Sequence, residues 1–127
     1  MRSKALVVED NENNRYLLTV LLEHAGFAVL TANDGRSGVD LARQVTPDII
    51  LLDIQMPEMD GYEVAALLKS DPILASIPIV GVSSFAMPGD RDKAMRAGFV
   101  GYIEKPVDPE RFAQSVGMFL TGARETP

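Results

Sequence analysis

Residues 48–61 read Asp-Ile-Ile-Leu-Leu-Asp-Ile-Gln-Met-Pro-Glu-Met-Asp-Gly, an aliphatic run that ends at a carboxylate and leads into a loop. Four branched aliphatic residues in a row, at 49–52, predict a short strand that is covered on both faces, as in the centre of a parallel sheet. Pro57 and Gly61 then predict a loop and the start of a helix. The pattern therefore places Asp53 at the carboxyl end of a buried strand.

Similar short apolar runs recur on both sides of this strand, and amphipathic segments separate them. The runs predict further strands at 5–8, 28–31, 79–82 and 100–103. The segments predict helices at 13–25, 35–45, 61–70 and from 88 or 89 to 98, and a last helix that starts at 109 with Asp108 as its cap. This alternation predicts an α/β fold, a flavodoxin-like, doubly wound, three-layer sandwich with a parallel sheet in the order 2-1-3-4-5. Small and polar neighbours of Val29 place the second strand at an edge.

Composition limits the classes of function. Of 127 residues, 46% are hydrophobic and 24% are charged, so we expect one domain over 1–127, with a core at about 4–120 and a loose tail at 121–127. The chain has no cysteine, which excludes a disulfide scaffold and thiolate metal sites and favours a reducing cytoplasm. A formal net charge of −6 argues against direct binding to nucleic acid phosphates, and no apolar run is long enough for membrane insertion or a signal peptide.

Polar side chains follow four of the predicted strands. Glu9 and Asp10 follow the first strand, Asp53 the third and Ser83 the fourth, and Lys105 stands two residues past the fifth. Doubly wound sheets bind ligands beyond the carboxyl ends of their strands, where the strand order reverses. Each residue alone also fits an ordinary role as a cap, a turn former or a surface charge. Their shared position at one edge of the sheet favours a common site.

The acidic residues of this edge predict a metal site. Three carboxylates that converge repel one another unless a cation lies between them. Oxygen ligands without histidine or cysteine favour Mg²⁺. We expect Asp10, Asp53 and the backbone carbonyl of Gln55 to hold the ion directly, with Glu9 acting partly through water.

A carboxylate beside such an ion and a lysine can act as the nucleophile of phosphoryl transfer, and Asp53 is the central one. Lys105 and the Ser83 hydroxyl are then expected to neutralise and bond the phosphoryl oxygens. No general base is needed, because a carboxylate attacks without losing a proton. The residues thus predict phosphoryl transfer to Asp53, with an aspartyl phosphate as the product.

Four motifs lie in order at residues 6–11 (Leu-Val-Val-Glu-Asp-Asn), 48–61, 82–84 (Val-Ser-Ser) and 102–106 (Tyr-Ile-Glu-Lys-Pro). Together they resemble the response regulator receiver domain, the phospho-acceptor module of two-component signalling, over about residues 4–120. The resemblance implies Mg²⁺ in the pocket and a cis bond between Lys105 and Pro106. It also assigns a role to each pocket residue: Asp53 is phosphorylated, Glu9 and Asp10 form the acidic pair, Ser83 carries the switch hydroxyl, Tyr102 is the switch aromatic and Lys105 is the pocket lysine. Ser84 departs from the pattern, because many members have alanine there.

Residues 9–15 particularly resemble receivers of hybrid kinases and phosphorelays. This implies a sensor histidine kinase or a histidine phosphotransfer protein as the phosphodonor, and a downstream protein as the target. The first helix is the expected docking surface, with Asn14, Arg15 and Leu18 beside the site. On phosphorylation, Ser83 is expected to bond the phosphoryl group and Tyr102 to turn inward into the space that Ser83 leaves.

Two further expectations concern the phosphoryl group and the extent of the chain. Phe85, two residues after Ser83, is expected to shield the phosphoryl group from water and to prolong its life. Met1 just before the first strand, and the lack of an output domain after residue 120, favour a stand-alone regulator. A receiver fragment of a hybrid histidine kinase is the alternative.

Three other functions compete with this interpretation. An aspartate-nucleophile phosphatase also uses a strand-end aspartate and magnesium, but it needs a second aspartate two residues later as general acid, and Gln55 stands there. A flavin-binding electron carrier needs a phosphate loop rich in Ser, Thr or Gly after the first strand, where residues 9–12 are mostly acidic. A receiver that binds partners without phosphorylation would not need the full set of pocket residues.

Overall fold

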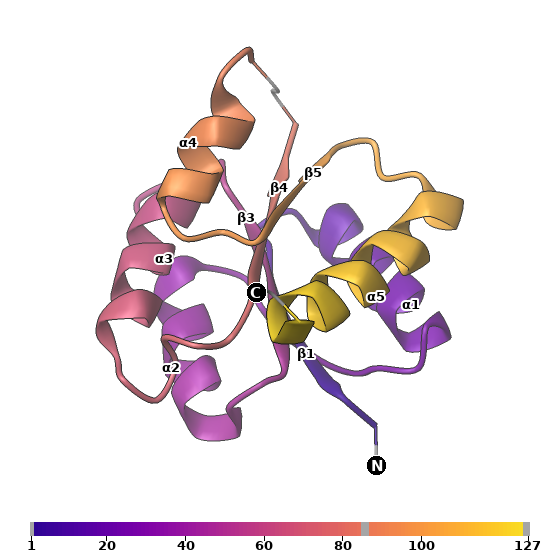
Figure 1. The fold of residues 1–127 in the computed structure, drawn as a ribbon, viewed down its shortest axis with the longest axis horizontal. Coiled ribbons are helices and arrows are strands. Elements are labelled where there is room, and N and C mark those ends of the chain that lie inside the picture. Colours follow the sequence, from indigo (N-terminus) through magenta and orange to yellow (C-terminus); the bar gives the residue numbers. More distant parts are fainter. Residues whose placement is uncertain (1, 85–86, 126–127) are drawn as a thin grey trace.

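The computed structural model describes residues 2–84 and 87–125, in which strands and helices alternate along the chain (Figure 1). All predicted strands and helices are present. In chain order the elements are β1 (Lys4–Val8), α1 (Glu12–His24), β2 (Ala28–Ala32), α2 (Gly35–Val45), β3 (Ile49–Asp53), α3 (Gly61–Ser70), β4 (Ile79–Ser83), α4 (Asp90–Arg96), β5 (Gly101–Glu104) and α5 (Pro109–Glu125).

The strands form one parallel sheet in the order β2-β1-β3-β4-β5, which confirms the predicted topology and the edge position of β2. β1 pairs with β2 on one side and with β3 on the other, so that Val8 lies beside both Ala32 and Leu52. Helices α1 and α5 cover one face of the sheet, and α2, α3 and α4 cover the other (Figure 1). The strand order therefore reverses between β1 and β3, where a doubly wound sheet opens to ligands.

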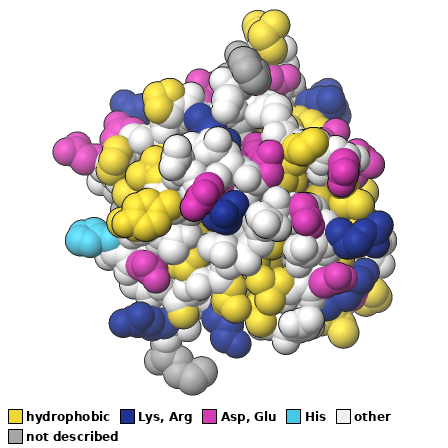
Figure 2. Space-filling view, turned by 180° about the vertical axis from the view of Figure 1, so that it is seen from behind, with side chains coloured by type: hydrophobic (Ala, Val, Ile, Leu, Met, Phe, Trp, Pro, Cys, Tyr) yellow, Lys and Arg dark blue, Asp and Glu magenta, His cyan; other side chains and the backbone are white. Residues whose placement is uncertain are grey.

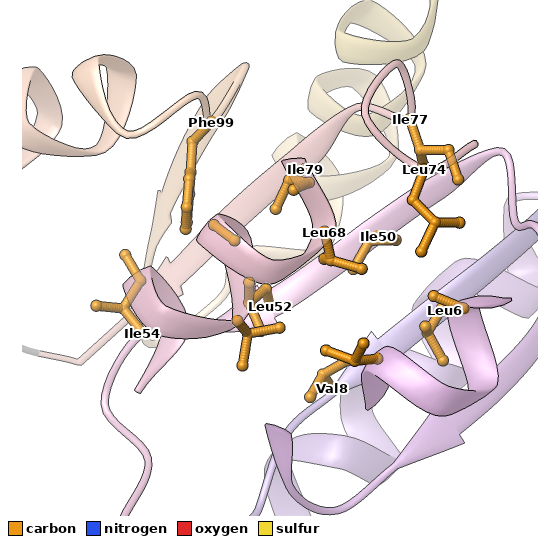
Figure 3. Close-up of a cluster of buried hydrophobic side chains, with 14 of the residues drawn as sticks. Leu6, Val8, Ile50, Leu52, Ile54, Leu68, Leu74, Ile77, Ile79 and Phe99 are labelled. Carbon is orange, nitrogen blue, oxygen red and sulfur yellow. The ribbon is translucent and has the colours of Figure 1, made fainter. Parts of the chain in front are cut away.

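Two hydrophobic cores hold the ends of the strands in place. Successive side chains of a strand point to opposite faces, so the central strands feed both cores. The core on the side of α2 and α3 includes Leu6, Val8, Ile50, Leu52 and Leu68 (Figure 3). The other core is built from the alternate strand residues and from α1 and α5, and includes Val7, Leu51, Leu18, Leu22 and Phe112. Each such buried aliphatic side chain contributes about 1.5–3 kcal/mol, so the strand ends form a firm base for a site.

A glycine in β4 lets an aromatic ring lie against the sheet. A Cβ atom on Gly81 would lie 2.6 Å from Cδ2 of Phe99 and 2.9 Å from Cδ1 of Ile54. Gly81 also lies beside Tyr102 of β5. The absence of a side chain at Gly81 therefore makes room for Phe99 in the core on the side of α4.

Two helix ends differ from the prediction. The loose tail predicted for 121–127 is wrong for residues 121–125, which continue α5. The chain has no proline between residues 110 and 126 to stop the helix, and Ala, Arg and Glu at 123–125 favour helix. Helix α4 is shorter than predicted, because Gly89 and Gly98 adopt positive φ angles of 92° and 99° on either side of it.

Within the described ranges, no helix is both long enough and apolar enough to cross a membrane.

Candidate functional site

The carboxyl ends of β1, β3, β4 and β5 meet at one edge of the sheet and bring together the predicted site residues Glu9, Asp10, Asp53, Ser83 and Lys105. Backbone hydrogen bonds fix the segments that follow the strands. The N–H of Ile54 donates to the carbonyl of Val82 at 3.0 Å, and the N–H of Lys105 donates to the carbonyl of Ser83 at 2.7 Å. The Lys105–Pro106 peptide bond is cis, as the resemblance implied.

Three carboxylates form a compact cluster at this edge. One oxygen from each of Glu9, Asp10 and Asp53 lies within 4.8 Å of the others. Glu9 and Asp53 are buried, with 1% and 3% of their surface exposed, whereas Asp10 is exposed. The N–H of Gln55 donates to Oδ1 of Asp53 at 3.1 Å and therefore orients that carboxylate. The cluster is therefore open to solvent at Asp10 and enclosed by protein at Glu9 and Asp53.

Lys105 supplies a positive charge beside the cluster. Its Nζ lies 2.8 Å from Oε1 of Glu9 and 3.6 Å from Oδ1 of Asp53, and only 12% of its side chain is exposed. The ammonium group thus lies nearer to Glu9 than to Asp53. One lysine facing three carboxylates leaves the site short of positive charge.

This shortage is visible in the pKa of Asp53. Burial of the carboxyl, followed by the nearby Glu9, raises the pKa of Asp53 from 3.8 to about 8, and Lys105 opposes this rise only in part. A divalent cation among these oxygens would reverse that balance. The donor set consists of carboxylate oxygens with no histidine or cysteine, so the residues present fit Mg²⁺.

Gln55 connects the ends of β3 and β4 through its side chain. Its Nε2 donates to the hydroxyl oxygen of Ser83 at 2.6 Å, and its Oε1 accepts from the N–H of Ser84 at 3.1 Å. Sequence reasoning placed Gln55 at the site, through its backbone carbonyl and beside the expected path of hydrolytic water, but did not predict these hydrogen bonds of its side chain. It missed them because the pairing depends on the register of β3 against β4, which no local pattern reveals.

Tyr102 is already buried in this structure. Only 5% of its surface is exposed, and it packs in the core on the side of α4. Its hydroxyl is buried without a hydrogen-bond partner among the described residues. The inward turn of Tyr102 on phosphorylation stays a prediction, and in this structure the ring is buried before any phosphoryl group is bound. Tyr102 lies beside Gly81 in the sheet and belongs to the same core cluster as Phe99.

The predicted docking residues of α1 differ in their exposure. Asn14 and Arg15 are partly exposed, but Leu18 is 2% exposed and packs in the core on the side of α1 and α5. The prediction of Leu18 as a contact residue is wrong, because helical periodicity turns it toward the sheet. Tyr16, Leu17 and Val20 are the exposed apolar residues of this helix. Figure 2 shows hydrophobic side chains next to the single histidine, which marks the end of α1.

Arg15 also has a role inside the site. Its guanidinium donates to the backbone carbonyl of Glu9 at 3.0 Å and so fixes the loop that carries the acidic pair. Phe85, which was expected to shield the phosphoryl group, lies outside the described residues.

Comparison with known proteins gives a consistent result. The family model of the response regulator receiver domain matches residues 5–117. Among curated proteins, the chain is 40% identical to the polar-differentiation response regulator DivK of Brucella anthropi over 123 residues, which cover 97% of this chain and 100% of that protein. The DivK protein of Brucella ovis matches at the same identity and coverage.

Solved structures share the fold. The chemotaxis protein CheY4 of Vibrio cholerae superposes with a TM-score of 0.88 at 27% identity, over 94% of this chain and 99% of that one. The receiver domain of a sensor histidine kinase from Pseudomonas aeruginosa gives a TM-score of 0.86 at 26% identity, over 95% and 99% of the two chains. That domain is described with a magnesium ion coordinated in its active site cleft.

Proposed function

Because this chain belongs to the response regulator receiver family, we propose that it accepts a phosphoryl group on Asp53 from a phosphohistidine of a two-component system or phosphorelay. The observation that carries the proposal is the buried carboxylate of Asp53 at the end of β3, with Glu9 and Asp10 on one side and the Lys105 ammonium 3.6 Å away. The phosphodonor is a sensor histidine kinase or a histidine phosphotransfer protein.

The transfer needs no general base. An oxygen of the ionised Asp53 carboxylate attacks phosphorus and forms the new O–P bond, while the P–N bond to the donor imidazole breaks and leaves its electron pair on the ring nitrogen. Lys105 offsets the negative charge that spreads over the phosphoryl oxygens, and the Ser83 hydroxyl donates a hydrogen bond to one of them. The product is an aspartyl phosphate.

The proposed ligands of one Mg²⁺ ion are Glu9, Asp10, Asp53 and the backbone carbonyl of Gln55. When bound, the ion supplies positive charge to the phosphoryl oxygens and lowers the pKa of Asp53. The carboxylate cluster and its shortage of positive charge support this assignment. The magnesium ion described for the Pseudomonas aeruginosa receiver supports it by similarity.

The readout of the switch is binding to a downstream protein. Phosphorylation would add charge and acceptor oxygens beside Ser83. The Tyr102 hydroxyl, buried and without a hydrogen-bond partner among the described residues, is the proposed group that changes position in response. Asn14 and Arg15 of α1 are proposed to contact the phosphodonor. We place this receiver domain, which the family model matches over residues 5–117, in the cytoplasm.

Gln55 argues against the competing phosphatase. A general acid is needed two residues after the nucleophile, and the amide of Gln55 cannot serve as one. The phospho-acceptor function is therefore the one that the site supports best.

Incubation with acetyl phosphate and Mg²⁺, followed by intact mass measurement, tests the proposal. The native chain should gain the mass of one phosphoryl group, whereas Asp53→Asn should gain none. Asp40→Asn, which changes an exposed aspartate of α2, is the matched control and should behave like the native chain. Equal mass gain in the native chain and in Asp53→Asn would place the phosphoryl group elsewhere and refute the assignment.

A further inference from the structure

The side chain of Gln55 makes two hydrogen bonds at the carboxyl end of β4. Its amide nitrogen lies 2.6 Å from the hydroxyl oxygen of Ser83, and its amide oxygen lies 3.1 Å from the backbone nitrogen of Ser84. Its own backbone N–H reaches Asp53 at 3.1 Å. One residue therefore links the proposed phospho-acceptor to the proposed switch hydroxyl.

The two groups that Gln55 engages lie at the carboxyl end of β4, the strand that pairs with β3 at Asp53. The Ser84 N–H is a backbone donor directly after the strand end, and its hydrogen bond now goes to the Gln55 amide oxygen. The Ser83 hydroxyl is fixed in position by the Gln55 amide nitrogen. A phosphoryl group on Asp53 presents oxygens that need such donors.

We propose that the Gln55 amide is a placeholder for the phosphoryl group: in the unphosphorylated protein its oxygen occupies the Ser84 N–H and its nitrogen holds the Ser83 hydroxyl in place, and the amide must be displaced before the Ser84 N–H can bond a phosphoryl oxygen. The inference rests on the proposed function and names a positioning residue for that reaction. Gln55 thereby sets how readily the site takes up the phosphoryl group.

The placeholder is suited to displacement because it is exposed. Gln55 and Ser84 both lie at the surface, whereas Ser83 is buried. Exposed hydrogen bonds exchange readily with water, and one such bond changes an equilibrium by about three- to tenfold. The Gln55 bonds can therefore restrain the loop without blocking the site.

The test compares two variants of Gln55. Gln55→Met keeps the length and bulk of the side chain but removes the amide, and Gln55→Ala removes both. Each retains the backbone carbonyl proposed as a metal ligand. Gln44→Ala, which truncates an exposed glutamine of α2, is the matched control. The probe is beryllium fluoride, a phosphoryl mimic, titrated at saturating Mg²⁺ and followed by NMR.

Both Gln55 variants should bind the mimic about three- to tenfold more tightly than the native chain and should take up phosphate faster from acetyl phosphate. Their affinity for Mg²⁺ alone should stay unchanged. In the unphosphorylated protein, the Ser84 amide proton should exchange with solvent faster in both variants than in the native chain. Gln44→Ala should match the native chain in every measurement.

Equal or weaker binding of the mimic by both variants would overturn the inference. A gain confined to Gln55→Ala would also overturn it, because the effect would then come from space and not from the amide. These outcomes leave Asp53 phosphorylation intact. If the native chain binds no mimic and gains no phosphoryl mass, the proposed function itself fails and the inference falls with it.

Discussion

Asp53 is buried, and the proposed phosphoryl transfer requires its carboxylate to carry a negative charge. These two properties oppose each other, because burial disfavours the charged form. Burial and the nearby Glu9 favour its protonated form and raise its pKa to about 8. Lys105 opposes this effect but lies closer to Glu9, at 2.8 Å, than to Asp53, at 3.6 Å. The metal-free site therefore holds Asp53 back from the ionised form that phosphoryl transfer requires.

This has a consequence for stability that can be measured. Between about pH 4 and pH 8, the folded metal-free protein keeps a proton on Asp53 that the unfolded chain has lost. A rise in pH removes that proton at the expense of the folded state, so the free energy of unfolding should fall across this window. We expect Asp53 to contribute a loss on the order of 2–4 kcal/mol. Urea unfolding at a series of pH values, with chelator present, measures it.

Asp53→Asn should remove most of this pH dependence, because asparagine does not titrate. Asp40→Asn should keep it, since that residue is exposed on α2. Identical slopes for Asp53→Asn and the native chain would show that Asp53 is ionised in the folded state throughout the window.

At the scale of single residues, sequence reasoning found the chemical groups but not their contacts. Glu9, Asp10, Asp53, Ser83 and Lys105 could be named as candidates because these carboxylates, this hydroxyl and this lysine follow predicted strands. The hydrogen bonds of the Gln55 side chain and the burial of Tyr102 could not be predicted, because they depend on strand register and on which face of a strand meets the core. The burial of Leu18 could have been predicted from the apolar periodicity of α1.

At the scale of elements, the first residue of α3 lies against the backbone at the end of β3. The N–H of Gly61 donates to the carbonyl of Ile54 at 3.0 Å. A Cβ atom on Gly61 would lie 2.7 Å from Cα of Ile54 and 2.8 Å from the carbonyl oxygen of Asp53. Backbone atoms cannot move aside as a flexible side chain can. Gly61 therefore permits α3 to begin close to Asp53, the proposed phospho-acceptor.

Gly61→Ala should therefore displace the backbone at Asp53. We expect a loss of about 1–3 kcal/mol in the free energy of unfolding, together with slower phosphorylation by acetyl phosphate. Gly117→Ala in α5 is the matched control, because nothing lies within 4 Å of the Cβ position there. It should stabilise the protein by about 0.5–1 kcal/mol through helix propensity. Urea unfolding of both variants distinguishes the two cases, and a neutral Gly61→Ala would contradict the close approach.

The positions of the helices and strands were easier to predict from the sequence than the contacts of single residues. Helices α2 and α3 begin and end where the sequence predicts, because Asp34 and Asp60 cap their starts and apolar spacing defines their inner faces. The end of α5 was missed because Thr121 and Gly122 are poor helix formers, although Ala, Arg and Glu at 123–125 favour helix. Such a segment follows the helix that precedes it.

At the scale of the whole molecule, a bound cation would connect two distant strands. Glu9 and Asp10 follow β1, and Asp53 ends β3. Mg²⁺ that binds only the folded arrangement should raise the melting midpoint, with a stabilisation of about 2.7 kcal/mol when its concentration is a hundred times the dissociation constant. Calorimetry with and without Mg²⁺ measures this effect.

Asp10→Asn should weaken the effect of Mg²⁺, because it removes one charge from the open side of the cluster. Asp40→Asn should leave the effect unchanged. An equal increase in the midpoint for Asp10→Asn and the native chain would exclude Asp10 as a ligand.

The ion pair between Glu9 and Lys105 joins residues 96 positions apart in the sequence. A ribosome must therefore translate nearly the entire chain before these two charges can meet. An incomplete or partly denatured copy has no assembled pocket, so it should not accept the proposed phosphoryl group. The proposed phosphorylation of Asp53 therefore requires a chain that has already folded.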